Sequence, residues 1–257
     1  MLRQKIRNKE KMIGTHTYLL DAAAAKIVAM AGYDYIWVDL EHTYKPLESV
    51  LSDVLIMKAM GTSVIVRVPQ DDLTFTKKVL ELGVDGIIFP MIRTAEQANK
   101  AIESTLYPPY GTRGFGPLNA VDYGYVDAQD YVDNTRTNVC RFIQIEHIDA
   151  IKNLDQIMEN EYIDGYIFGP NDLSGSINDL GNVYGEATVS LIKEAITKLK
   201  AKGKYIGLST GEMSYEKLKF WSDFGVDMIS AGADYMFLRQ SALQTRIALE
   251  QAHKFSE

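Results

Sequence analysis

Short, almost continuously apolar runs alternate along the chain with longer segments in which apolar residues recur every three or four positions. The short runs have the pattern of parallel strands covered on both faces, and the longer segments have the pattern of amphipathic helices. The strands are expected at residues 12–20, 35–40, 63–68, 86–90, 139–146, 165–172, 205–209 and 226–230. The helices are expected at residues 21–31, 46–60, 72–82, 94–104, 128–134, 148–158, 185–202, 215–224 and 234–255.

Eight strand–helix repeats within 257 residues predict an α/β protein built as a (β/α)8 barrel. Residues 1–257 read as a single domain, because neither a linker nor a change of composition divides the sequence. The alternation of strands and helices is interrupted at residues 106–125, where a run rich in glycine and proline predicts a long loop.

Composition narrows the possible partners and compartments. A net charge of −7 argues against a nucleic-acid partner, which would require a surplus of lysine and arginine. The single cysteine, Cys140, lies in an apolar run and is expected to pack in the core. The charged start of the chain does not resemble a secretory signal, and no stretch approaches the roughly 18 apolar residues of a membrane span. We therefore expect a cytoplasmic protein that has no membrane partner.

Polar side chains follow several of the expected strands at their carboxyl ends, where (β/α)8 barrels form their active sites. A guanidinium, an imidazole, amides and carboxylates that converge on one opening suit a small, oxygen-rich anion and a metal ion. The residues expected at this opening are Asp39, Glu41, His42, Arg67, Gln144, Glu146, Asn171 and Asp172.

Two carboxylates, Glu146 and Asp172, end consecutive strands joined by the expected helix at 148–158, so both should reach the same edge of the sheet. Close carboxylates repel each other unless a divalent cation or a shared proton intervenes, and Mg²⁺ or Mn²⁺ prefers such oxygen ligands. Glu146 could instead be a salt-bridge partner, and Asp172 with Asn171 could simply begin a helix. Arg67 could bind a substrate carboxylate or form an ion pair with either acidic residue.

A histidine, His42, follows the second expected strand and is suited to proton transfer near neutral pH. It could also be a zinc ligand, but His16 and His147 stand isolated and supply no second ligand at the usual spacing. No expected strand ends on a lysine, which disfavours an aldolase of the Schiff-base type.

Five segments spread in order along the chain resemble the HpcH/HpaI aldolase family of class II pyruvate aldolases. They are 39–42 (Asp-Leu-Glu-His), 64–69 (Val-Ile-Val-Arg-Val-Pro), 107–114 (Tyr-Pro-Pro-Tyr-Gly-Thr-Arg-Gly), 144–146 (Gln-Ile-Glu) with 152–154 (Lys-Asn-Leu), and 169–174 (Gly-Pro-Asn-Asp-Leu-Ser). The resemblance implies a phosphoenolpyruvate/pyruvate-binding barrel that reversibly cleaves a 4-hydroxy-2-oxo acid to pyruvate and an aldehyde. The reaction would pass through a metal-bound pyruvate enolate, and would serve the catabolism of aromatic compounds or sugar acids.

The resemblance also implies roles for individual residues. Glu146 and Asp172 match ligands of Mg²⁺, Mn²⁺ or Co²⁺, and Arg67 matches the arginine that steadies the enolate. Gln144, Asn171 and Asp172 are expected to contact the substrate beside Arg67.

Proton transfer is implied for His42, paired with a carboxylate at Glu81, where the family more often has aspartate. The Gly-Thr-Arg-Gly stretch at 111–114 matches a loop that lines the site. Family members pair subunits by exchanging the last helix and often form hexamers, so residues 234–255 could build such a homo-oligomer or could close their own barrel.

Other readings remain open. A related metal-dependent barrel lyase or decarboxylase could act on an acyl-CoA, a phosphorylated substrate or another 2-oxo acid. The glycines within 207–211 and 231–233 lie where barrels often bind phosphate, although they could equally form tight turns. A non-catalytic barrel that binds a ligand is a further alternative, because fold alone does not determine activity.

Overall fold

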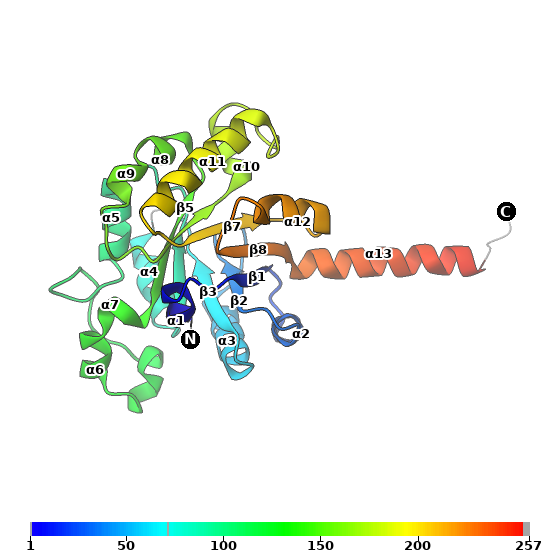
Figure 1. The fold of residues 1–257 in the computed structure, drawn as a ribbon. Coiled ribbons are helices and arrows are strands. Elements are labelled where there is room, and N and C mark those ends of the chain that lie inside the picture. The colour runs from blue at the N-terminus through cyan, green and yellow to red at the C-terminus, as the bar shows by residue number, and fades with distance from the viewer. Residues whose placement is uncertain (1, 71, 254–257) are drawn as a thin grey trace.

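The computed structural model describes residues 2–70 and 72–253, which form a closed barrel of eight parallel strands (Figure 1). Each strand pairs with the next, and β8 pairs with β1. The strands are β1 Met12–Thr17, β2 Tyr35–Asp39, β3 Ser63–Arg67, β4 Gly86–Phe89, β5 Cys140–Ile145, β6 Gly165–Phe168, β7 Ile206–Thr210 and β8 Met228–Ala233. The predicted (β/α)8 barrel is confirmed.

Helices surround the barrel, and several begin with the capping residues that the sequence supplies. Asp21 and Asp72 accept hydrogen bonds from backbone N–H groups at the starts of α2 and α4, and Thr94 forms a capping box with Gln97 at the start of α5. The helices are α1 Leu2–Arg7, α2 Ala22–Met30, α3 Leu47–Ala59, α4 Leu73–Leu80, α5 Ala95–Glu103, the 3₁₀ helix η1 Asn119–Gly124, α6 Ala128–Asp133, α7 Thr135–Asn138, α8 Ile148–Lys152, α9 Leu154–Ile157, α10 Pro170–Ser176, α11 Glu186–Ala201, α12 Tyr215–Ser222 and α13 Asp234–His253.

The interior of the barrel is filled by large side chains rather than left as a pore. Phe142 on β5 reaches toward the neighbouring strands, where Gly86 and Gly165 leave room for its ring. A Cβ atom at Gly165 would stand 2.8 Å from that ring, so a side chain there would displace it. The small α1 closes the amino-terminal end of the barrel, because Leu2 and Ile6 are buried in the inner cluster.

Short helices account for most differences from the sequence-based expectation. α1, half of whose residues are charged, was not expected as a helix. The segment of α10 was read as the end of a strand, with a helix beginning at Asn171 and Asp172 as the alternative, and the structure has the helix. β6 ends at Phe168, and Pro170 then begins α10, so Asp172 lies in the first turn of a helix rather than on a strand.

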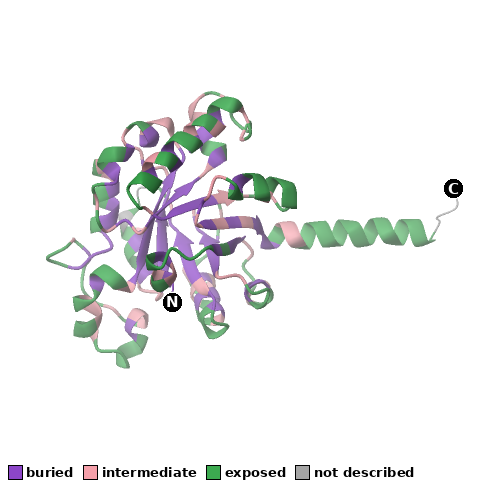
Figure 2. Cartoon of the chain, viewed as in Figure 1, coloured by how far each residue is buried: buried purple, intermediate pink, exposed green. Residues whose placement is uncertain are grey.

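The last helix, α13, projects away from the barrel instead of packing along it (Figure 1). Its first residue, Asp234, is buried, but the rest of the helix is largely exposed (Figure 2). The outer faces of β1 and β8, which an eighth helix of the barrel would cover, are correspondingly open, and Ile13 is 60% exposed. The expectation that the helix continues to residue 255 extends past residue 253, outside the described residues.

In the part of the chain that the structure describes, no helix combines the length and apolarity needed to cross a membrane.

Candidate active site

A cavity of about 230 Å³ opens at the carboxyl-terminal end of the barrel. Six of the nine residues predicted for the site contribute to its lining. These are His42, Arg67, Gln144, Glu146, Asn171 and Asp172. Of the other three, Asp39 and Glu41 contact Arg67, and Glu81 lies away from the cavity.

Arg67, the last residue of β3, is buried at the base of this cavity and is held by acidic neighbours. One Nη atom contacts Asp39, and the other lies 3.0 Å from Glu41 Oε2. The guanidinium also lies 5.3 Å from the ring of Trp37 and donates a 3.3 Å hydrogen bond to Gln144. Burial alone would lower the pKa of Arg67, but Asp39 and Glu41 outweigh burial and raise it, so the side chain remains a fixed cation.

Glu146, which directly follows β5, is 1% exposed and has defined partners for both carboxylate oxygens. Oε1 accepts a 2.7 Å hydrogen bond from the backbone N–H of Met91, and Oε2 accepts one of 2.7 Å from Gln144 Nε2. Burial, partly offset by the Met91 bond and reinforced by Asp172, raises the pKa of Glu146 to about 8. Arg67 forms its ion pairs with Asp39 and Glu41. The alternative ion pair with Glu146 or Asp172 is therefore not formed.

Asn171 and Asp172 line the same cavity from the first turn of α10, where both are exposed. Within residues 2–70 and 72–253, no cluster of three or more His, Cys, Asp or Glu side chains is arranged to hold a metal ion by itself. A cation at this site would therefore rely on Glu146, Asp172, water and substrate oxygens, a donor set that suits a hard divalent ion.

His42 lies at the mouth of the cavity, where its side chain is 61% exposed. Its position is fixed by the Asp39 carboxylate, whose Oδ1 accepts hydrogen bonds from the backbone N–H groups of Glu41 at 2.9 Å and His42 at 2.8 Å. The nearest carboxylate to the imidazole is that of Glu41, whose Oε2 lies 3.7 Å from Nε2.

The expected pairing of His42 with Glu81 is not formed within the chain. Glu81 follows the last residue of α4, at the end of the helix that returns the chain to the amino-terminal end of the barrel. There its carboxylate lies 2.7 Å from Arg113 Nη2 and accepts a hydrogen bond from the backbone N–H of Leu118. The two residues therefore lie at opposite ends of the barrel.

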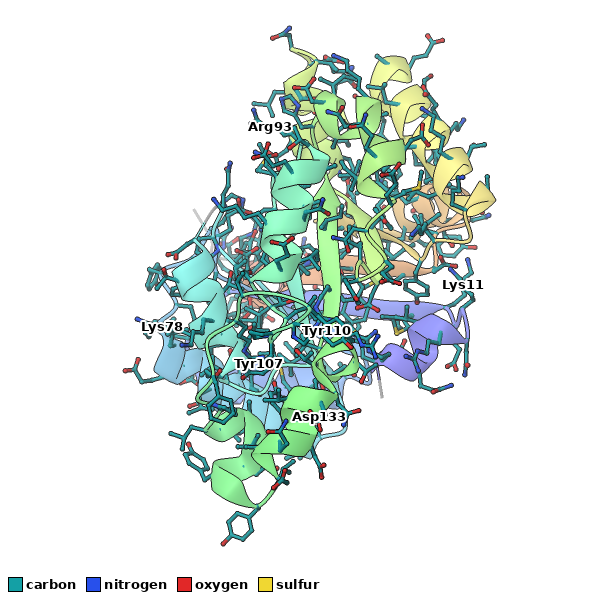
Figure 3. The ribbon with its side chains drawn as sticks, turned by 90° about the vertical axis from the view of Figure 1, so that its left-hand side faces the viewer. Lys11, Lys78, Arg93, Tyr107, Tyr110 and Asp133 are labelled. Carbon is teal, nitrogen blue, oxygen red and sulfur yellow. The ribbon has the colours of Figure 1, made fainter. Side chains whose placement is uncertain are left out.

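The loop at residues 106–125 also lies away from this chain's cavity, contrary to the expectation that it lines the site. Arg113 within it contacts Glu81 and stacks over the ring of Tyr107 at 4.6 Å, so the loop packs on the amino-terminal side. Figure 3, in which the left-hand side of Figure 1 faces the viewer, shows Tyr107 and Tyr110 near the middle, with Asp133 below them and Arg93 toward the top.

Two further residues of the cavity were missed by the sequence analysis, which treated His16 as isolated. His16 on β1 and Ser209 on β7 both line the cavity, and they are hydrogen-bonded to each other at 2.9 Å. Their positions near the carboxyl ends of expected strands were visible in the sequence, but their contact depends on the barrel closing β8 against β1.

A closed (β/α)8 barrel whose polar cavity lies at the carboxyl ends of its strands defines a barrel enzyme. The family described as HpcH/HpaI aldolase/citrate lyase matches residues 13–239, and the chain belongs to that family. The resemblance seen in the sequence is thereby confirmed.

The relatives agree with this assignment. The chain is 29% identical over 253 residues to 2-keto-3-deoxy-L-rhamnonate aldolase of Escherichia coli K12, covering 98% of this chain and 93% of the relative. It is 27% identical over 234 residues to hydroxypyruvate/pyruvate aldolase of Roseovarius nubinhibens, covering 91% and 90%. The crystal structure of an HpcH/HpaI aldolase from Desulfitobacterium hafniense DCB-2 superposes with a TM-score of 0.89 at 26% identity, covering 97% of this chain and 96% of that chain. The protein is thus an enzyme, a carbon–carbon lyase of the aldolase type.

Proposed function

We propose that this enzyme is a divalent-metal-dependent aldolase that reversibly cleaves a 4-hydroxy-2-oxo acid to pyruvate and an aldehyde. The observation that carries the proposal is the buried Arg67, which faces a cavity of about 230 Å³ together with the Gln144–Glu146 pair. A cavity of this size suits a small 2-oxo acid. A phosphorylated or acyl-CoA substrate is less well supported, because among the described residues lining the cavity Arg67 is the only lysine or arginine and it already contacts two carboxylates.

The crowding of carboxyl groups around a single arginine supports a cation at the site. Arg67 is surrounded by Asp39, Glu41 and Glu146, and Asp172 acts electrostatically on Glu146. The residues that would hold Mg²⁺, Mn²⁺ or Co²⁺ are Glu146 and Asp172. When bound, such an ion would withdraw negative charge from the carboxylate and 2-oxo oxygens of the substrate.

The residues of the chain bind the substrate, hold one another in place and transfer the proton. Arg67 binds the oxygens of the 2-oxo acid and supplies a preorganised positive charge for the enolate oxygen. Gln144 donates to Glu146 and accepts from Arg67, and so keeps both in place. His42 takes the proton of the 4-hydroxyl, the bond between C3 and C4 breaks, and the electrons of that bond pass to the enolate of pyruvate while the aldehyde leaves. Protonation of C3 then completes pyruvate.

The test is pyruvate release from a panel of 4-hydroxy-2-oxo acids after treatment with EDTA and again after Mg²⁺, Mn²⁺ or Co²⁺ is restored. We expect release only with the metal, and loss of release in Glu146→Gln and Asp172→Asn. The matched control is Glu159→Gln, an exposed carboxylate beyond α9. Metal-independent release that borohydride traps on a lysine would overturn the mechanism.

We also propose that the protein is a homo-oligomer in which α13 of one copy covers β1 and β8 of another. An apolar groove of about 520 Å³ lies over these strands, and it includes Ile13, Tyr215 and Leu218. The projecting helix carries exposed Leu243 and Ile247 one turn apart, which suits such a groove. Leu243→Glu with Ile247→Glu should dissociate the oligomer in light scattering, whereas Leu180→Glu, an exposed site elsewhere, should not.

An oligomer would also reconcile Glu81 with a role in proton transfer. Because Glu81 and His42 lie at opposite ends of one barrel, they can act together only when they come from different subunits. Co-expression of His42→Ala and Glu81→Ala chains should then recover part of the activity that each variant lacks alone. If mixed oligomers recover nothing, Glu41, 3.7 Å from His42, is the carboxylate that serves it.

A further inference from the structure

A buried ion pair lies just beyond His42 in the chain, and the proposed reaction does not use it. Lys45 Nζ lies 2.5 Å from Asp53 Oδ2, and both side chains are completely buried. Within the described residues, neither the ammonium nor the carboxylate has another hydrogen-bond partner. Neither residue lines the cavity, so neither contacts a substrate that is bound there.

Stability alone does not explain this ion pair. Moving two charges out of water has a cost in free energy that their attraction recovers only in part. Burial accordingly raises the pKa of Asp53, although Lys45 opposes the shift. Two apolar side chains of similar shape would usually give equal or greater stability at such a position.

Asp53 occupies a core-facing position of α3. The buried residues of this helix are Val50, Asp53, Val54 and Met57, which recur at helical spacing. Lys45 precedes the helix, so its side chain must run along the first turns of α3 to meet Asp53. The contact therefore fastens the segment before α3 to the buried face of the helix.

The start of α3 is not fastened by a capping side chain. Serine, threonine, aspartate or asparagine at the N-cap would bond to the first turn of the helix. The N-cap residue here is Pro46, which makes no such side-chain hydrogen bond. The neighbouring Tyr44 is 88% exposed, so its side chain does not hold the segment in the core either. The ion pair of Lys45 supplies the attachment that a cap would otherwise provide.

The other end of the same loop is attached to β2. Asp39, the last residue of that strand, accepts hydrogen bonds at Oδ1 from the backbone N–H groups of Glu41 and His42. The loop at residues 40–46 is thus held on the strand side by Asp39 and on the helix side by the Lys45–Asp53 pair. His42 lies between the two attachments, and its side chain is exposed at the mouth of the cavity.

We propose that Lys45 and Asp53 are positioning residues whose ion pair holds the 40–46 loop so that His42 meets the substrate. The inference rests on the proposed function, in which His42 takes the proton of the 4-hydroxyl. Proton transfer requires the base to lie within hydrogen-bond reach of the proton, so a looser loop slows this step. Binding of the 2-oxo acid at Arg67 does not depend on the loop, because Arg67 belongs to β3.

The test replaces both charges with apolar side chains, in the double variant Lys45→Met with Asp53→Leu. Its urea midpoint should equal or exceed that of the wild type, which shows that it folds. With Mn²⁺ at saturation, its kcat for pyruvate release should fall about tenfold, because a misplaced base loses part of its effect. Its KM and its inhibition constant for pyruvate should stay within about twofold of the wild type.

A single variant separates the charge from the loop. Lys45→Met alone leaves Asp53 as an unpaired buried carboxylate, so its urea midpoint should fall below that of the double variant. Its kcat in the folded fraction should fall by the same factor as in the double variant, because both lack the attachment.

Amide hydrogen exchange measures the loop without reference to activity. Exchange in a peptide that covers residues 40–46 should become about tenfold faster in the double variant, while exchange in the strands stays unchanged. The matched control is Lys198→Met with Glu194→Leu, which removes a 2.9 Å ion pair on the surface of α11. That control should change neither the exchange of the loop nor kcat.

The outcomes separate this inference from the proposed function. Unchanged exchange in the double variant would overturn the attachment, and faster exchange with unchanged kcat would overturn its role in the reaction. A fall in kcat with an equal rise in the inhibition constant for pyruvate would also overturn that role, because the whole cavity would then be disturbed. If the wild type cleaves no 4-hydroxy-2-oxo acid, the proposed function fails, and hydrogen exchange still decides whether the ion pair holds the loop.

Discussion

Two buried arginines lie at opposite ends of this barrel, and their neighbours differ in charge. Arg67 ends β3 at the carboxyl-terminal side, and Arg141 lies near the start of β5 at the amino-terminal side. Arg67 faces the carboxylates of Asp39 and Glu41 and opens onto the cavity. Arg141 is 1% exposed and donates to neutral oxygens, including the carbonyl of Thr135 at 2.6 Å.

The difference appears in the two pKa values. Burial lowers the pKa of Arg141 to about 10 and outweighs the opposing effect of Asp164, whereas the carboxylates around Arg67 outweigh burial and raise its pKa. Arg141 donates to the carbonyl groups of Thr135, Arg136 and Val139 and so stabilises the chain. Arg67 belongs to a charged cluster with an excess of acid, which is suited to binding a cation and an anionic substrate together. Burial alone therefore does not distinguish a structural arginine from a functional one, but the partners do.

The same substitution at both positions tests this contrast, and the larger effect is expected at the active site. In Arg67→Lys the positive charge remains, but one ammonium cannot reproduce the planar contacts of the guanidinium. We expect kcat/KM for cleavage to fall by roughly 10²- to 10³-fold, measured by steady-state pyruvate release. The free energy of unfolding in urea should fall by only about 1 kcal/mol. A variant with normal kinetics would remove Arg67 from the mechanism.

Arg141→Lys should give the opposite result. A lysine cannot reach the Thr105 hydroxyl and the carbonyls of Thr135, Arg136 and Val139 together. We expect the free energy of unfolding to fall by about 3 kcal/mol, since unpaired buried carbonyls are costly. The folded enzyme should keep kcat/KM within about twofold of the wild type. Loss of turnover in the folded fraction would contradict the conclusion that Arg141 serves stability and not catalysis.

The sequence predicted only in part which end of the barrel carries the active site and which residues surround its arginine. Strand–helix alternation was enough for the barrel, and the barrel places residues at strand ends, so Arg67, Gln144 and Glu146 could be assigned to one cavity. The partners of Arg67 could not be assigned, because Asp39 lies 28 positions away and meets it only through the pairing of β2 with β3.

Glu81 illustrates a different limit. The family resemblance implied a role beside His42, but the helix that carries Glu81 returns the chain to the other end of the barrel. Such a resemblance indicates which residues act together in a family and does not indicate whether one chain brings them together. His16 was missed for the converse reason, since its partners lie on β7 and β8, about 190 or more positions away.

The pH dependence of stability tests whether His16, at the carboxyl-terminal end, is buried as a neutral ring. His16 has a folded-state pKa of about 4 against an ordinary value of 6.5, so the folded protein binds fewer protons than the unfolded chain between these values. Stability from this group is complete above about pH 6.5 and is lost as the pH falls toward 4. Lowering the pH from 7 to 4.5 should therefore cost the wild type about 2.5 kcal/mol more than His16→Phe. Chemical denaturation at both pH values measures the difference, and parallel losses would mean that His16 is not buried as a neutral ring.

The smallest expected effect concerns the helix that closes the amino-terminal end. Arg3 on α1 donates to Thr137 O at 2.7 Å and lies 2.5 Å from Asp164, and thereby ties α1 to the segment that Arg141 also holds. Arg3→Ala should lower the free energy of unfolding by about 1 kcal/mol. Arg7→Ala, at an exposed position of the same helix, should leave it unchanged within error. If Arg3→Ala leaves the free energy of unfolding as unchanged as Arg7→Ala does, α1 is held by Leu2 and Ile6 and not by Arg3.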